Sequence, residues 1–247
     1  MPDMAGKAVP DAIRRVLPLL SEPPTDPQVG DGYLDLLGGA GDEPAGPVQS
    51  LWESGRGSAA YDHAQALVRR LLPAVQQLPG PARRPPSGAT VLDVGCGPGN
   101  VTAGLGRAVG AAGLAVGLDV SRPMLARAVR AEAADNVAFV RADARELPFR
   151  DGTFDVITSI AALQLIPDPT AVLGALVRAL APGGFLAAMV PTPRGGLMEH
   201  ATKLLGVRGG LSFFDPDETA EILHSHGMNT VHTRRSGTVL WITGRRP

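Results

Sequence analysis

The segment VLDVGCGPGN, residues 91–100, restricts the fold of this chain more than any other stretch. The first residues of this segment complete a short apolar run over residues 88–95. The run leads directly into a turn that contains Gly95, Gly97 and Gly99. Glycine has no side chain, so its backbone can turn tightly and approach a ligand closely. A short apolar run that ends in such a turn is typical of a strand buried in a parallel sheet. The segment therefore predicts a buried strand, a glycine turn and a helix that begins at the turn.

The rest of the central sequence alternates between strand and helix patterns. One predicted helix begins at the N-cap Ser121, and another begins at Asp168 and ends near Pro182. Because repeated strand–helix–strand units form right-handed crossovers, a parallel sheet covered by helices is expected. The further predicted strands are residues 113–120, 137–142, 154–163 and 184–191.

Two regions flank this centre. Residues 1–80 contain stretches rich in proline, glycine and aspartate, and an amphipathic helix pattern between Ser58 and Pro73. We expect this region to be a helical extension that acts as a lid, and residues 81–247 to be the core domain. After the centre, a helix is expected over residues 216–226, and two strand-like runs around Ser236 predict an antiparallel hairpin.

Composition and charge exclude several classes of protein. Hydrophobic residues make up 44% of the chain and charged residues 19%, which is enough apolar material for a sizeable core. The formal net charge of -1 lacks the basic excess of a strong nucleic-acid-binding protein. Cys96 is the only cysteine, and no segment approaches the roughly 20 apolar residues that span a bilayer. We therefore expect a cytoplasmic protein without an intramolecular disulfide.

An acidic residue, Asp93, lies in the strand directly before the glycine turn. A dinucleotide-binding turn has the spacing G-x-G-x-x-G and holds a pyrophosphate at the start of a helix. Here the spacing is G-x-G-x-G, and Asn100 follows Gly99. A carboxylate attracts a cation and repels a phosphate. The turn therefore suits S-adenosylmethionine, which has a sulfonium and an ammonium, better than it suits NAD.

Together with the elements that follow it, this turn resembles the class I S-adenosylmethionine-dependent methyltransferases. The resemblance covers residues 89 to about 191 and is strongest to the small-molecule branch (methyltransferase type 11, similar to enzymes of quinone biosynthesis). It implies an α/β fold with a Rossmann-like, doubly wound, mostly parallel sheet of seven strands. It also implies S-adenosyl-L-methionine as the cofactor and methyl transfer as the reaction.

The resemblance also implies which residues bind the cofactor. Asp119 follows Gly99 by about 20 residues, as a ribose-binding acid does in nucleotide folds. Asp143 lies where the family's acid bonds the adenine amino group, Met124 packs on the adenine, and Gln164 contacts the methionine end. The residues expected to bind the cofactor are Tyr61, Asp93, Gly95, Gly97, Gly99, Asn100, Asp119, Val120, Met124, Asp143, Ala144, Ser159 and Gln164.

The acceptor side of the site has weaker signals. Methyl transfer from a sulfonium needs alignment and exclusion of water, and it needs a base only if the acceptor keeps its proton until late. His200 is the candidate base, and an exposed helix histidine is the alternative. The candidate pocket residues Tyr33, Trp52, Phe213 and Phe214 have an alternative as packing aromatics. No cluster has metal-ligand spacing, so no metal is expected.

The expected activity is methyl transfer to oxygen, nitrogen or carbon of a small organic acceptor. The stretch after the fourth predicted strand lacks the N/D-P-P-Y segment of DNA-adenine methyltransferases, so a nucleic acid acceptor is not expected. The abundance of Ala, Gly, Pro and Arg suggests natural-product biosynthesis by association. Two alternatives stay open: a protein that binds S-adenosylmethionine without turnover, and a NAD-dependent oxidoreductase. A homodimer also stays open.

Overall fold

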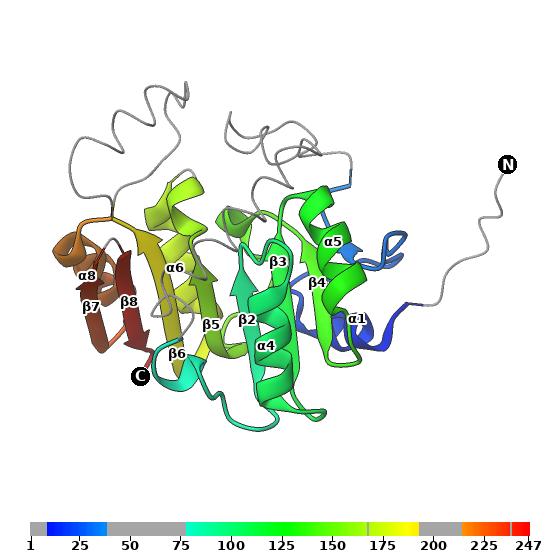
Figure 1. The fold of residues 1–247 in the computed structure, drawn as a ribbon, viewed down its shortest axis with the longest axis horizontal. Coiled ribbons are helices and arrows are strands. Elements are labelled where there is room, and N and C mark those ends of the chain that lie inside the picture. Colours follow the sequence, from blue (N-terminus) through cyan, green and yellow to red (C-terminus); the bar gives the residue numbers. More distant parts are fainter. Residues whose placement is uncertain (1–8, 39–77, 167, 193–213, 238) are drawn as a thin grey trace, which may run out of the picture.

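The computed structural model describes residues 9–38, 78–166, 168–192, 214–237 and 239–247. In this part of the chain, helices cover both faces of an eight-stranded sheet (Figure 1). The strand order is β1-β4-β3-β2-β5-β6-β8-β7. The α/β, mostly parallel, doubly wound fold predicted from the sequence is confirmed.

All neighbouring strands from β1 to β6 in this order are parallel, and β8 is antiparallel to both β6 and β7. The predicted C-terminal hairpin is therefore confirmed. The strands are β1 (Leu34–Asp35), β2 (Thr90–Val94), β3 (Leu114–Asp119), β4 (Val137–Arg141), β5 (Phe154–Ile160), β6 (Leu180–Pro191), β7 (Thr230–Ser236) and β8 (Val239–Arg245). The eighth strand is β1, whose two residues are too few to produce a period in the sequence.

The helices lie in two layers. In Figure 1, α4 and α5 lie in front of the sheet, and α1, α6 and α8 lie behind it. No helix in the described ranges is both long enough and apolar enough to cross a membrane. The helices are α1 (Asp11–Val16), α4 (Asn100–Val109), α5 (Arg122–Glu132), α6 (Pro169–Ala179) and α8 (Pro216–Ser225), and the short 3-10 helices are η1 (Leu17–Leu19), η3 (Gly80–Ala82), η4 (Ala144–Glu146) and η5 (Leu163–Leu165).

Side chains just before α5 and α6 cap the first turns of these helices. The Ser121 hydroxyl accepts a hydrogen bond from the backbone of Met124, and the Asp168 carboxylate accepts one from Ala171. Both predicted N-caps are thus confirmed. At its other end α6 is shorter than predicted, because Leu180 pairs with Phe154 and so begins β6.

The core consists of aliphatic side chains on both faces of the sheet. Leu92 and Ile157 are buried together with residues of α1, α6 and α8, whereas Val91 and Ala115 are buried together with residues of α4 and α5. Because the strands are covered on both faces, Val91, Leu92 and Val94 of β2 are all apolar, with the buried Asp93 between the last two. This rigid sheet fixes the positions at which its carboxyl-terminal loops begin.

Candidate functional site

The candidate site lies at the carboxyl end of β2, where the direction of strand order reverses. From β2 the chain continues to β3 and β4 on one side, and β5 and β6 follow on the other side. In open α/β sheets, ligands bind beyond the carboxyl ends of the strands at this switch point. The glycine turn of residues 95–99 occupies this position.

Three glycines of the turn have left-handed backbones, with φ of 70° at Gly95, 52° at Gly97 and 83° at Gly99. A Cβ at Gly95 would overlap the Cβ of Ala162, and one at Gly99 would lie 2.7 Å from the Phe139 ring. At Gly97 no atom of the described part of the chain lies within 4 Å of the corresponding position. The turn is therefore packed tightly at both ends and has open space at its centre, as a backbone cradle for a ligand requires.

Asp93 lies beneath this turn, inside the protein. Its side chain accepts hydrogen bonds from the hydroxyls of Thr102, at 2.7 Å, and Thr158, at 2.9 Å, and the residue is 2% exposed. Burial raises the pKa of Asp93 to about 6, although the two hydroxyls oppose this rise. The structure therefore links Asp93 to α4 and β5, and its expected attraction to a cationic ligand stays a prediction.

Asp119 ends β3 and reaches the glycine turn from the neighbouring strand. One carboxylate oxygen accepts a hydrogen bond from the backbone N–H of Gly97 at 2.8 Å, and the other accepts one from Ser121 at 2.9 Å. The residue is half-buried. These two N–H groups hold the carboxylate between the centre of the glycine turn and the start of α5.

Asp143 follows β4 and is the N-cap of η4. Its carboxylate accepts a hydrogen bond from the backbone of Arg145 at 2.8 Å, and the Arg145 guanidinium lies 2.6 Å from it. Burial alone would raise the pKa of Asp143, but the hydrogen bonds and charge of Arg145 outweigh it, so the pKa is lowered. Asp143 is thus an ionised acceptor at neutral pH.

The loop after β5 brings an unsatisfied amide to the same end of the sheet. The buried side chain of Gln164 donates to the carbonyl of Ala161 at 2.7 Å, and its Oε1 has no hydrogen-bond partner among the described residues. Buried polar atoms nearly always have partners, so this oxygen marks a place for a donor. Ala162 contacts the glycine turn at Gly95, which puts this loop beside the turn.

The remaining predicted cofactor residues have different degrees of exposure. Ser159 is fully buried and donates its hydroxyl to the carbonyl of Val94 at 3.0 Å, so it braces the strand that leads into the turn. Met124 and Ala144 are buried at 4% exposure, and Val120 and Asn100 are half-buried. Tyr61 lies outside the described residues.

Of the residues expected at the acceptor pocket, the structure describes two. Tyr33 is 2% exposed, and burial is the main cause of its raised pKa; its hydroxyl lies 3.5 Å from Asp31. Phe214 is half-buried against the core. Both contacts are those of packing aromatics. Trp52, Phe213 and the candidate base His200 lie outside the described residues.

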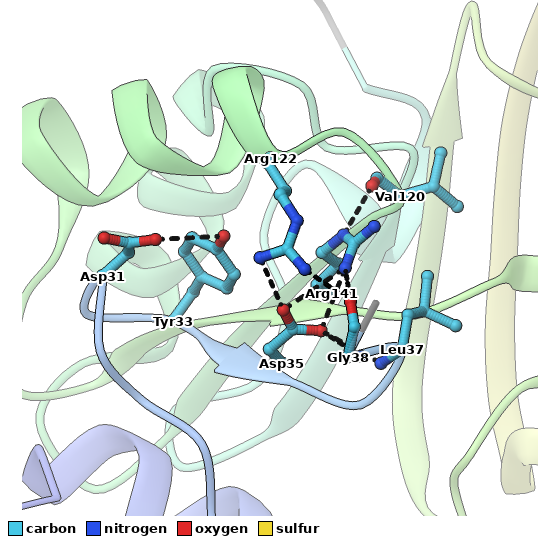
Figure 2. Close-up of polar contacts among 8 residues, drawn as sticks. All are labelled: Asp31, Tyr33, Asp35, Leu37, Gly38, Val120, Arg122 and Arg141. Atoms are coloured by element: carbon cyan, nitrogen blue, oxygen red, sulfur yellow. Dashed lines mark hydrogen bonds and ion pairs between the residues drawn. The ribbon is translucent and has the colours of Figure 1, made fainter. Parts of the chain in front are cut away.

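Sequence reasoning missed three charged residues that adjoin the site: Asp35, Arg122 and Arg141 (Figure 2). One signal was present, because Arg141 is a charged residue at the end of the otherwise apolar run VAFVR. A fully buried arginine needs a partner, so it predicts a carboxylate nearby. The sequence did not indicate which carboxylate, because Asp35 is 106 residues away along the chain.

Comparison with known proteins gives a consistent family. Residues 91–184 match the family model of a methyltransferase domain. Demethylmenaquinone methyltransferase of Bacillus licheniformis is 42% identical over 100 residues, which cover 40% of this chain and 43% of that protein. Nocamycin O-methyltransferase of Saccharothrix syringae is 35% identical over 158 residues, which cover 62% of this chain and 53% of that protein. The chain thus spans about half the length of these curated relatives.

A solved structure gives the same fold at low sequence identity. Haemonchus contortus phosphoethanolamine N-methyltransferase 2, in complex with S-adenosyl-L-methionine, superposes with a TM-score of 0.57 at 18% identity and covers 67% of this chain and 50% of that chain. Residues 91–184 are thus similar to the methyltransferase domain, and the fold is that of S-adenosylmethionine-dependent methyltransferases.

Proposed function

We propose that this protein transfers a methyl group from S-adenosyl-L-methionine to an oxygen, nitrogen or carbon atom of a small organic acceptor. The observation that supports this most directly is the position of Asp119. Its carboxylate lies at the switch point and is held by the N–H groups of Gly97 and Ser121. A carboxylate in this place can accept hydrogen bonds from a ribose diol, which are worth about 1.5–3 kcal/mol when charged.

The described residues fit the rest of this cofactor. Asp143 would accept a hydrogen bond from the adenine amino group, and Val120, Met124 and Ala144 would line the adenine. The unpartnered Oε1 of Gln164 fits the ammonium of the methionine end, because it is a buried acceptor beside the glycine turn. The open space at Gly97 lets the backbone come close to the ligand.

When bound, the cofactor supplies an electrophilic methyl carbon on a sulfonium. The protein's own contribution is to bind and orient the two reactants and to exclude water between them. Asp119 and Asp143 would fix the nucleoside, and Gln164 would orient the amino-acid end. A base is required only for an acceptor that keeps its proton until late, and His200 stays our candidate for that role.

The class of acceptor is proposed from the relatives. One curated relative is a demethylmenaquinone methyltransferase, and another is the nocamycin O-methyltransferase. Both names indicate a small organic acceptor, so we propose an acceptor of this kind, including natural products, and not a nucleic acid. Trp52 and Phe213 stay in the proposed pocket, whereas the described contacts of Tyr33 and Phe214 favour a packing role for these two. The proposed location of the enzyme is the cytoplasm.

Calorimetric titration with S-adenosylhomocysteine tests the proposed cofactor site. We expect Asp119→Ala to weaken binding by roughly tenfold to a hundredfold, because the charged hydrogen bonds to the ribose are lost. Asp151→Asn is the matched control, since Asp151 is exposed in the turn before β5, at the opposite end of the sheet. Binding that is equally tight in all three proteins would contradict the assignment of Asp119.

A parallel thermal unfolding series separates the alternative cofactors. A ligand at about 100 times its dissociation constant adds about 2.7 kcal/mol of stability, which raises the unfolding midpoint measurably. We expect S-adenosylmethionine and S-adenosylhomocysteine to raise the midpoint and NAD(H) to leave it unchanged. A rise with NAD(H) alone would favour an oxidoreductase. Methylated product from a panel of small acceptors would distinguish an enzyme from a protein that only binds the cofactor.

A further inference from the structure

One buried guanidinium joins three parts of the chain beside the candidate site. Arg141, at the end of β4, is 1% exposed. Its Nη1 lies 3.2 Å and 3.3 Å from the two carboxylate oxygens of Asp35, and it donates to the carbonyl of Gly38 at 2.8 Å. Its Nε donates to the carbonyl of Val120 at 3.0 Å. Arg141 therefore connects the N-terminal segment to the loop between β3 and α5.

A second cation meets the same carboxylate. Arg122, the first residue of α5, lies with its Nη1 2.9 Å from Asp35 Oδ2, and it also donates to the carbonyl of Gly38. Figure 2 shows both guanidinium groups directed toward Asp35 from different elements. Asp35 Oδ1 in addition accepts the backbone N–H groups of Leu37 and Gly38, each at 3.0 Å. The Asp35 carboxylate, 11% exposed, thus pairs with two arginines among the described residues.

These contacts act on the backbone that carries Asp119. Val120, whose carbonyl Arg141 binds, directly follows Asp119, and Arg122 directly follows the N-cap Ser121. Ala142 directly follows Arg141, and its backbone N–H donates a hydrogen bond to the carbonyl of Asp119 at 3.2 Å. The segment 119–122 is consequently held by the glycine turn on one side and by the Asp35 cluster on the other.

We propose that Asp35 is a positioning residue for cofactor binding. By holding Arg141 and Arg122 it fixes the backbone of residues 119–122, and this backbone sets the direction in which the Asp119 carboxylate meets the ribose. The inference rests on the proposed function. Without the Asp35 charge, the buried cation Arg141 loses its ion pair with Asp35, and its guanidinium is expected to move or to recruit water. Its hydrogen bond to the Val120 carbonyl then weakens, and the backbone next to Asp119 is held less firmly.

The test is a double-mutant cycle on S-adenosylhomocysteine binding, measured by calorimetry well below the unfolding temperature of each protein. The variants are Asp35→Asn, Asp119→Ala and the double variant. We expect Asp35→Asn to weaken binding of S-adenosylhomocysteine and of adenosine by about tenfold each, because the effect acts at the nucleoside end. In the Asp119→Ala background the same substitution should weaken binding by less than about threefold, since the carboxylate that it positions is absent.

Asp31→Asn is the matched control, since it removes an exposed carboxylate of the same segment whose described contact is the Tyr33 hydroxyl. We expect its affinity to equal that of the unmodified protein. If Asp35→Asn does not fold, Arg122→Gln removes the more exposed half of the cluster and leaves the Arg141–Asp35 pair, and we expect about a threefold loss.

The outcomes separate the two claims. No binding of S-adenosylhomocysteine by the unmodified protein overturns the proposed function itself. Tight binding by the unmodified protein with an unchanged affinity in Asp35→Asn, or in Arg122→Gln when that variant is used, overturns only the positioning role. An equal loss from Asp35→Asn with and without Asp119 also overturns it, because a general structural role predicts additive effects.

Discussion

Alanine at position 95 is expected to lower the free energy of unfolding by about 2–5 kcal/mol. Gly95 has φ of 70°, a left-handed conformation that costs an L-residue about 1–2 kcal/mol. Its new Cβ would also overlap the Cβ of Ala162, a short side chain that has no rotamer into which it can move. Overpacking of this kind adds about 1–3 kcal/mol, because the backbone must shift. Urea unfolding of Gly95→Ala measures the sum.

The control is Gly152→Ala. Gly152 has φ of 71°, almost the same as Gly95, but no atom lies within 4 Å of its Cβ position. It should therefore lose only the conformational part, about 1–2 kcal/mol. Equal losses in the two variants would mean that the contact between the glycine turn and the loop after β5 is looser than the structure shows. Because Gln164 lies in that loop, Gly95→Ala should also weaken cofactor binding.

The second large effect is a change in the pH dependence of stability when Asp93 becomes asparagine. The pKa of Asp93 is raised from 3.8 to about 6 in the folded protein, mainly by burial. The folded state therefore binds a proton more readily than the unfolded state does, and this group makes the protein less stable as the pH rises from about 4 to about 6. A shift of this size corresponds to about 3 kcal/mol.

Asparagine has no such titration, so the difference in stability between Asp93→Asn and the unmodified protein should move in favour of the variant by about 2 kcal/mol between pH 4 and pH 7, since a small part of the effect has already developed at pH 4. Denaturant unfolding at several pH values measures this difference, which cancels the contributions of all other groups. Asp151→Asn, at an exposed position, gives the background. A difference that does not vary with pH would show that folding leaves the pKa of Asp93 at its ordinary value.

The sequence predicted the central fold well because each central element has a strong local signal. A strand, a helix start or a turn is each specified by residues within the element or next to it. This holds for the apolar runs of β2 to β6, the N-caps Ser121 and Asp168, and the hairpin turn. The two-residue β1 could not be predicted in this way. It forms because Leu34 and Asp35 pair with Val140 and Arg141 far along the chain, and local patterns contain no information about such a pairing.

The candidate site was predictable to a similar degree. Asp119 and the glycines could be located because a parallel sheet brings the ends of neighbouring strands together. Asp93 was expected to face the ligand, and no sequence pattern indicated that Thr102 and Thr158 would donate hydrogen bonds to it within the protein. Roles for Tyr61, Trp52, His200 and Phe213 stay predictions, since these residues lie outside the described part of the chain.

The short strand β1 has a practical consequence for anyone who shortens this protein. Leu34 and Asp35 occupy the hydrogen-bonding edge of β4, and Leu36 donates to the carbonyl of Arg141. A protein trimmed to residues 81–247 would present that edge to solvent as a row of unpaired backbone groups, which is a template for pairing with another chain. It would also leave Arg141 without the carboxylate that balances it. Such a fragment would be prone to aggregate in concentrated solution, whereas one that keeps residues 9–38 would keep the edge covered.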